Sequence, residues 1–155
     1  MTTIATAAAL LHAALQDLHA GEADQADRLG GIAGHCSDPA LRSLLEEEAE
    51  RTARQAQRIV DAGIDTSGPA NLWMAGILDD AERDTRATQA GRLLDIAVIG
   101  AIRKGKAAEI VSSETAIALA DEVDLPDLRA IASANRDEEM ETDRRLRERL
   151  AALAG

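Results

Sequence analysis

Four charged residues stand where stripes of apolar residues at helical spacing predict an apolar side chain. Glu22 interrupts such a stripe in the first periodic segment, and Glu48, Lys106 and Glu138 do so in three later segments. Other polar residues continue or flank the interruptions: Thr52, Gln55, Ser113, Glu139, Thr142 and Asp143. Because each interruption falls near the middle of its segment, we expect one polar layer to cross the interior of the fold.

Carboxylates that point inward from all four helices of a bundle are typical of a two-metal site, where hard cations offset the cost of burying several negative charges. Without such compensation the carboxylates would not stay ionised. An alternative stays open: if each stripe is misphased by one position, the same residues form the solvated rim of a thinner core. The coincidence of four interruptions favours the buried layer.

Helices must position this layer. Apolar residues recur at steps of three and four over about residues 4–34, 39–62, 71–86, 91–121 and 126–153, and no segment alternates as a strand does. Asp38-Pro39 supplies a cap and a first-turn proline, and Gly63 ends the second segment. The pattern predicts an all-α, antiparallel four-helix bundle in a single domain, 1–155, with an additional short helix between the second and third long helices. We expect the short helix to cross one end of the bundle.

The composition excludes several classes of function. The 155-residue chain carries a formal net charge of −11, which opposes binding to nucleic acid and to anionic membrane surfaces. No segment approaches the roughly 20 continuous apolar residues of a membrane span. Cys36 is the one cysteine and has no partner for an internal disulfide, and no basic region precedes the apolar N-terminal run, so we expect a cytoplasmic protein.

Several motifs resemble the YciF-like branch of the ferritin-like superfamily, over nearly the whole chain. Leu18-His19-Ala20-Gly21-Glu22 is similar to the family segment that ends in its first metal-site glutamate. The other segments that carry the resemblance are Ser37–Leu41 at the start of the second helix, Leu45–Thr52 where the family has a histidine and a glutamate, Met74–Ile77 in the short helix, Asp95–Ile110 where the family has a glutamate-histidine-tyrosine-glutamate run, and Glu138-Glu139 with Asp143 and Leu146 in the last helix.

The departures from the family fall on its metal-binding residues. Glu48 stands where the family has histidine, Arg51 where it has glutamate, and Lys106-Ala107-Ala108 where it has glutamate, histidine and tyrosine. Charged lysine and arginine have no lone pair to give a metal. We therefore expect a degenerate di-iron site with no catalytic, cofactor-binding or metal-binding residues, replaced by an internal salt-bridge network of Glu22, Glu48, Arg51, Lys106, Glu138 and Glu139.

The resemblance implies a ferritin-like, stress-associated protein that forms homodimers, and the rewritten site implies that it is not an enzyme and needs no cofactor. Two alternatives stay open. One is a di-metal carboxylate oxidoreductase or metal-binding protein whose shifted, carboxylate-only site holds iron or manganese through Glu22, Glu48, Glu109, Glu138 and Glu139. The other is a helical interaction module with an unidentified protein partner around Trp73, because tryptophan is enriched in interface anchors.

Overall fold

The computed structural model describes residues 3–155, which form five helices and no strands. The helices are α1 (Ala7–Ala33), α2 (Pro39–Asp61), α3 (Leu72–Ala87), α4 (Arg92–Glu122) and α5 (Pro126–Ala154). The all-helical prediction is confirmed, and each observed boundary lies within three residues of the expected one. The largest difference is at the start of α1, which begins after the Thr6 cap.

Local chemistry sets where the helices start and stop. The side chain of Thr6 accepts a hydrogen bond from the backbone N–H of Ala9, Asp38 accepts one from Leu41, and Asn71 caps α3 in the same way. Pro39 and Pro126 occupy the first turns of α2 and α5, where a missing N–H leaves no hydrogen bond unmade. These capping signals depend only on neighbouring residues, so the sequence already contains them.

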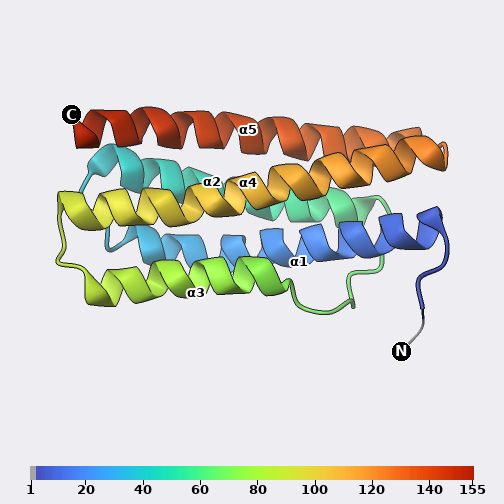
Figure 1. Ribbon diagram of the computed structural model, residues 1–155, viewed down its shortest axis with the longest axis horizontal. Coiled ribbons are helices and arrows are strands. Elements are labelled where there is room, and N and C mark those ends of the chain that lie inside the picture. Colours follow the sequence, from blue (N-terminus) through green and yellow to red (C-terminus); the bar gives the residue numbers. More distant parts are fainter. Residues whose placement is uncertain (1–2) are drawn as a thin grey trace.

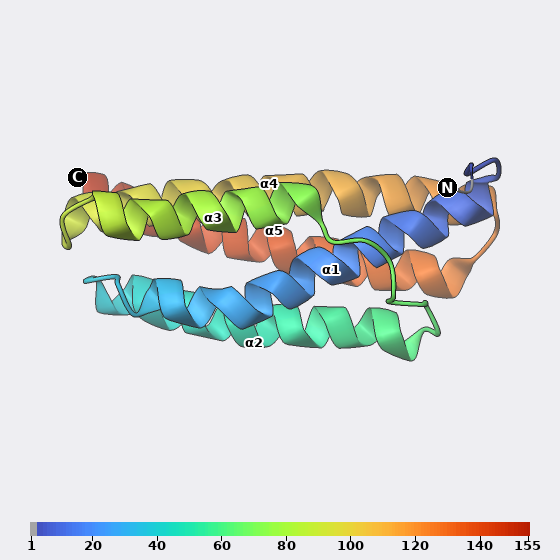
Figure 2. The ribbon, with the colours of Figure 1, turned by 90° about the horizontal axis from the view of Figure 1, so that it is seen from below.

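The four long helices lie side by side along the long axis of the molecule (Figure 1). α1 and α2 run antiparallel and pack together as one pair, and α4 and α5 form a second antiparallel pair. Figure 2 shows the two pairs from a second direction, with α3 lying along α4. The connection from α2 to α4 is the long one, and it contains α3.

The expectation that the short helix crosses the end of the molecule is wrong, because α3 runs along α4 and α1. Its apolar stripe of Met74, Leu78 and Ala81 is buried in the same cluster as the adjacent face of α4. Gly105 permits the close approach, since a Cβ atom there would lie 3.2 Å from the terminal methyl of Met74. Burial of this stripe holds α3 along the long helices and not across their end.

Two apolar clusters fill the interior, one towards each end of the long helices. One contains Leu29, Leu45 and Ile102, and the other contains Leu15 and Ile117. Between them lies a set of buried polar side chains that we call the polar layer: Glu22, Gln25, Glu48, Thr52, Gln55, Lys106, Glu109, Ser113, Asn135, Glu139 and Thr142. The layer therefore sits at mid-height, enclosed by apolar packing above and below.

Among residues 3–155, no helix is both long enough and apolar enough to cross a bilayer.

Candidate functional site: a buried lysine among carboxylates

Lys106 of α4 lies inside the polar layer and has no exposed surface. Its Nζ atom lies 2.6 Å from Oε1 of Glu48 on α2 and 2.8 Å from Oε2 of Glu139 on α5. The same nitrogen donates a hydrogen bond to Oε1 of Gln25 on α1 at 2.8 Å, and it lies 3.9 Å from Oε2 of Glu109. One ammonium group thus contacts side chains from each of the other three long helices.

The charges in the layer are mutually dependent. Burial by itself lowers the pKa of Lys106, but the charges of Glu109, Glu139 and Glu48 outweigh this effect and raise that pKa above its ordinary value. Burial raises the pKa of Glu22 and of Glu109 well above the ordinary range of a glutamate, and the charge of Glu139 adds to both shifts. Lys106 therefore stays cationic, whereas two of the four carboxyl groups around it resist ionisation.

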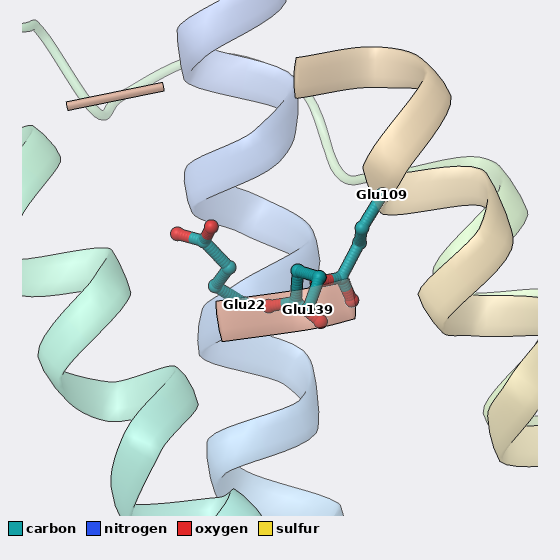
Figure 3. Close-up of side chains that lie close together, drawn as sticks. All are labelled: Glu22, Glu109 and Glu139. Atoms are coloured by element: carbon teal, nitrogen blue, oxygen red, sulfur yellow. The ribbon is translucent and has the colours of Figure 1, made fainter. Parts of the chain in front are cut away.

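Three of these carboxylates lie close together although they come from different helices. Glu22 belongs to α1, Glu109 to α4 and Glu139 to α5 (Figure 3). Each offers a carboxylate oxygen, and these oxygens all lie within 4.8 Å of one another. Each of the three residues is only 1% exposed, so solvent does not screen their repulsion.

Two buried amides orient this group. The Nδ2 atom of Asn135 donates to Oε1 of Glu22 at 3.1 Å, and the Nε2 atom of Gln25 donates to Oε1 of Glu109. Oε2 of Glu22, Oε2 of Glu109 and both oxygens of Glu139 are buried without a hydrogen-bond partner, although Oε2 of Glu139 forms an ion pair with Lys106. Glu22 and Glu109 are thus each held by an amide through one oxygen, whereas Glu139 is held by its ion pair with Lys106.

Arg51 lies at the edge of the polar layer, between α2 and α5. Its Nε atom lies 3.9 Å from Oε2 of Glu48, and its Nη1 atom donates to the hydroxyl of Thr142 and to the backbone carbonyl of Glu138, both at 3.3 Å. Thr142 in turn donates to Oε2 of Glu48 at 2.7 Å. The side chain of Arg51 is 22% exposed, so it forms the boundary between the buried layer and solvent.

On α5 the charged interruption lies one residue later than predicted, because Glu139 and not Glu138 faces the interior, whereas Thr142 is buried as expected. The buried positions of α5 are Ala132, Asn135, Glu139, Thr142 and Leu146. Glu138 is 26% exposed and pairs with Arg58, whose Nη1 atom lies 2.7 Å from its Oε2 atom. Glu138 therefore belongs to an outer ion pair and makes no contact with Lys106 among the ion pairs of residues 3–155.

Three participants were not anticipated from the sequence: Gln25, Arg58 and Asn135. Gln25 follows Glu22 by one helical turn, and Asn135 lies one turn before Glu139, so their spacing places them on the inward faces. Arg58 also donates to Oδ1 of Asn135 at 2.9 Å, which fixes the amide so that its Nδ2 atom points to Glu22. The spacing could have identified both amides, but nothing in the sequence pairs Arg58 with α5.

Among residues 3–155, the cysteine, the tryptophan and the histidines do not form a comparable site outside the layer. The Cys36 thiol is buried, and burial raises its pKa to about 12, so it is a poor nucleophile at neutral pH. Trp73 packs against the apolar cluster, and its indole N–H donates to Oδ2 of Asp17 at 3.1 Å. His12 and His35 are exposed and His19 is half-buried, so no histidine of the chain lies among the buried residues of the layer.

Comparison with known proteins identifies one family and solved structures of similar fold. The profile of a family described as "Domain of unknown function (DUF892)" matches residues 6–154. The Escherichia coli stress protein YciF has a solved structure that superposes with a TM-score of 0.92 at 21% identity, covering 97% of this chain and 98% of that one. YcfI of Rhodopseudomonas palustris, described as a candidate structural protein, superposes with a TM-score of 0.87 at 23% identity, covering 93% of this chain and 94% of that one.

No curated protein matches the sequence. The two structural similarities establish the fold, and the resemblance to the YciF-like proteins is confirmed.

Proposed function

Because the chain belongs to the DUF892 family, we propose that it is a cytoplasmic, non-catalytic, ferritin-like four-helix-bundle protein associated with stress, in which a Glu/Lys/Arg network takes the place of a di-iron site. One observation carries the proposal: the fully buried ammonium of Lys106 lies within 2.8 Å of carboxylate oxygens from both Glu48 and Glu139. A permanent cation therefore sits between carboxylates that a metal would otherwise have to bridge.

The donor set around Lys106 does not fit a two-metal centre. The ammonium contributes a positive charge and no lone pair, and it uses both Glu48 and Glu139 as partners. Di-iron sites of helical bundles also take histidine from two helices, whereas the histidines of this chain lie outside the buried layer.

The network differs from the expected one in its outer members. Lys106 contacts Glu48 and Glu139 directly, whereas Arg51 reaches Glu48 only at 3.9 Å and Glu138 pairs with Arg58 instead. We propose that Glu22 belongs to the network as a neutral acid, hydrogen-bonded to Asn135 at 3.1 Å. Its raised pKa, caused first by burial, supports this protonation state.

The stress association is carried over from the E. coli protein of similar fold, which is described as a stress protein. We also propose that the chain forms a homodimer, as the resemblance implies. Quantifying the protein in its source organism before and after osmotic or oxidative challenge tests the first point, and light scattering of the purified chain tests the second. Unchanged abundance of the protein after the challenge would contradict the stress association. A monomer in light scattering would contradict the homodimer.

Iron loading tests the loss of the di-iron site. Purified chain is incubated aerobically with Fe(II), freed of unbound metal and analysed for iron. We expect far less than the about two irons per chain of a di-iron bundle. Lys106→Glu, which exchanges the cation for a potential ligand, is expected to bind more iron than the wild type. About two irons per wild-type chain would support the di-metal oxidoreductase alternative and overturn our choice.

The interaction-module alternative has one supporting observation, since Leu72 is 84% exposed beside Trp73. Affinity capture with the wild type and with Leu72→Ser distinguishes it, because this substitution alters the exposed surface and leaves the half-buried Trp73 in place. A specific protein that is lost with Leu72→Ser would favour the module over our proposal.

A further inference from the structure

We infer that the outer face of α4 packs against the same face of a second copy of this chain, with the two helices antiparallel, so that Lys104 of each copy pairs with Glu114 of the partner subunit. The inference rests on the homodimer of the proposed function, to which it adds the surface and the direction of association. No residue of the polar layer takes part in it.

Large apolar side chains lie exposed on the outer face of α4. Leu93 and Val111 are 63% and 64% exposed. α1, α3 and α5 pack against the other sides of this helix, which lies along the upper edge of the molecule in Figure 2. Small residues occupy most of the surface between the two side chains: Ala97, Gly100 and Ala107. An apolar face of this extent marks a contact with another protein.

Positions on this face follow a heptad repeat. Steps of four and three residues connect them, as in the seam of a coiled coil. We call them the outer seam: Leu93, Ala97, Gly100, Lys104, Ala107, Val111, Glu114 and Ala118. The buried residues of α4, such as Val98 and Ile102, lie on the sides that face the other helices. The outer seam is therefore additional to the core, and it suits one further helix.

The order of residues along the outer seam fits an antiparallel copy of itself. A twofold axis at the level of Glu109 places the members from Gly100 to Ala118 opposite one another. Next to the axis, Ala107 lies opposite Val111 of the partner subunit, and further out Gly100 lies opposite Ala118. A small residue opposite a larger one lets two helix axes come close. Each contact occurs twice, as the symmetry of a dimer of identical chains requires.

The charges of the outer seam select the antiparallel direction. Lys104 and Glu114 are both exposed. Within residues 3–155 the ion pairs of α4 use other residues: Arg103, Lys106, Glu109 and Asp121. In an antiparallel dimer each Lys104 meets Glu114 of the partner subunit, whereas a parallel dimer would set lysine against lysine and glutamate against glutamate. Complementary charges favour the first arrangement, and repulsion disfavours the second.

The outer faces of α2 and α5 are less suited to this contact because they are more highly charged. The exposed residues of α2 include Glu46, Glu50 and Arg54, and those of α5 include Glu141 and Arg144. Interface cores are depleted of charged residues, since charges are costly to remove from water. The outer seam carries one residue of each sign, although the chain has 17 basic and 28 acidic residues.

Charge reversal tests both the surface and the direction. Sedimentation velocity of the full chain at low ionic strength, over a range of protein concentrations, gives the dissociation constant of the dimer. Lys104→Glu and Glu114→Lys each set like charges against one another twice, so we expect each to raise that constant at least tenfold. Reversal is a stronger test than removal, because an exposed ion pair contributes little by itself. Circular dichroism checks that each variant is folded.

A mixture of the two variants tests the pairing itself. Lys104→Glu makes both charged positions of the outer seam acidic, and Glu114→Lys makes both basic. An equimolar mixture should therefore form a mixed dimer with a dissociation constant within about threefold of the wild type, because every charge again faces its opposite. Glu50→Lys is the matched control, since it makes the same change on the exposed face of α2 and should dimerise as the wild type does.

The outcomes separate this inference from the proposed function. A monomeric wild type leaves the outer seam to a different partner and overturns both the homodimer and the inference. A wild-type dimer that both reversals leave unchanged overturns the inference alone, because another surface then holds the dimer. Reversals that weaken the dimer without recovery in the mixture overturn the pairing of Lys104 with Glu114.

Discussion

The Nζ atom of Lys106 on α4 lies 2.6 Å from Oε1 of Glu48 on α2, and neither side chain is more than 2% exposed. α2 and α4 belong to different antiparallel pairs and are not packed neighbours, so this ion pair crosses the middle of the molecule. Charges buried this deeply depend on each other, because each one alone would face the full cost of desolvation. The pair therefore links the two halves of the fold through their interior.

Removing the lysine should be strongly destabilising. In Lys106→Ala, Glu48 and Glu139 lose their buried counter-ion, and we expect the free energy of unfolding to fall by about 3–5 kcal/mol. Urea denaturation in the presence of a chelator measures this loss without contributions from bound metal. Lys104→Ala is the control, because Lys104 is exposed on the same helix and its removal should change stability by no more than about 0.5 kcal/mol. Equal stabilities of the two variants would refute the buried network.

A second buried carboxylate, Asp95, ties α4 to the start of α2. Its two oxygens accept the backbone N–H groups of Ser37 and Asp38, each at 2.9 Å. Asp95→Ala leaves both donors without their partner, so we expect a loss of about 1–3 kcal/mol in the free energy of unfolding. Asp38→Ala removes the cap of α2 and a partly exposed ion pair with Arg149, whose Nε atom lies 2.8 Å from Oδ2 of Asp38, and should lose about 1 kcal/mol. Chemical denaturation compares the two, and a smaller effect for Asp95→Ala would contradict this role.

Replacing either of two helical glycines by alanine should change the stability of the protein, but in opposite directions. A Cβ atom at Gly21 would lie 2.8 Å from the side-chain nitrogen of Asn71, which donates to the carbonyl of Asp17 and belongs to the cap of α3. Gly21→Ala must displace this capping side chain and should lower the melting temperature. Gly76 is exposed and has nothing within 4 Å, so Gly76→Ala should stabilise the protein by up to about 1 kcal/mol.

Thermal unfolding of these two variants provides the measurement. If both alanines changed the melting temperature in the same direction, the close approach between α1 and the start of α3 would be unsupported.

The Cys36 thiol should be unreactive in the native protein. It is 1% exposed, and burial raises its pKa from 9.0 to about 12. A thiol reagent should label the folded chain slowly at pH 8 and the denatured chain quickly, at one thiol per chain. Rapid labelling without denaturant would show that the region around Cys36 opens readily.

The raised pKa of Cys36 makes the free energy of unfolding depend on pH, with stability falling as the pH rises. The folded-state pKa of Cys36 lies above its ordinary value, so its contribution to stability is complete below about pH 9 and is lost as the pH rises towards about 12. Urea denaturation of the wild type should show a decline over this window. Cys36→Ala should show a shallower one, and identical slopes would contradict the raised pKa.

The sequence by itself determined the five helices and the height at which polar residues cross them. Capping residues such as Asp38 and the recurrence of apolar residues are local features, readable without any partner helix. The positions of Glu22, Glu48 and Lys106 in their stripes followed from the same periodicity, and all three lie in the interior.

Tertiary packing decided which side chains of α5 and α3 face inward. One residue along a helix corresponds to a rotation of about 100°, and the alternatives Glu138 and Glu139 are chemically identical, so the local pattern could not choose between them. The pairing of Glu138 with Arg58 and the burial of Met74 against Gly105 depend on contacts between distant segments. Those contacts are set by how the helices pack as a whole, because burying a carboxylate is costly unless a counter-ion such as Lys106 lies within reach.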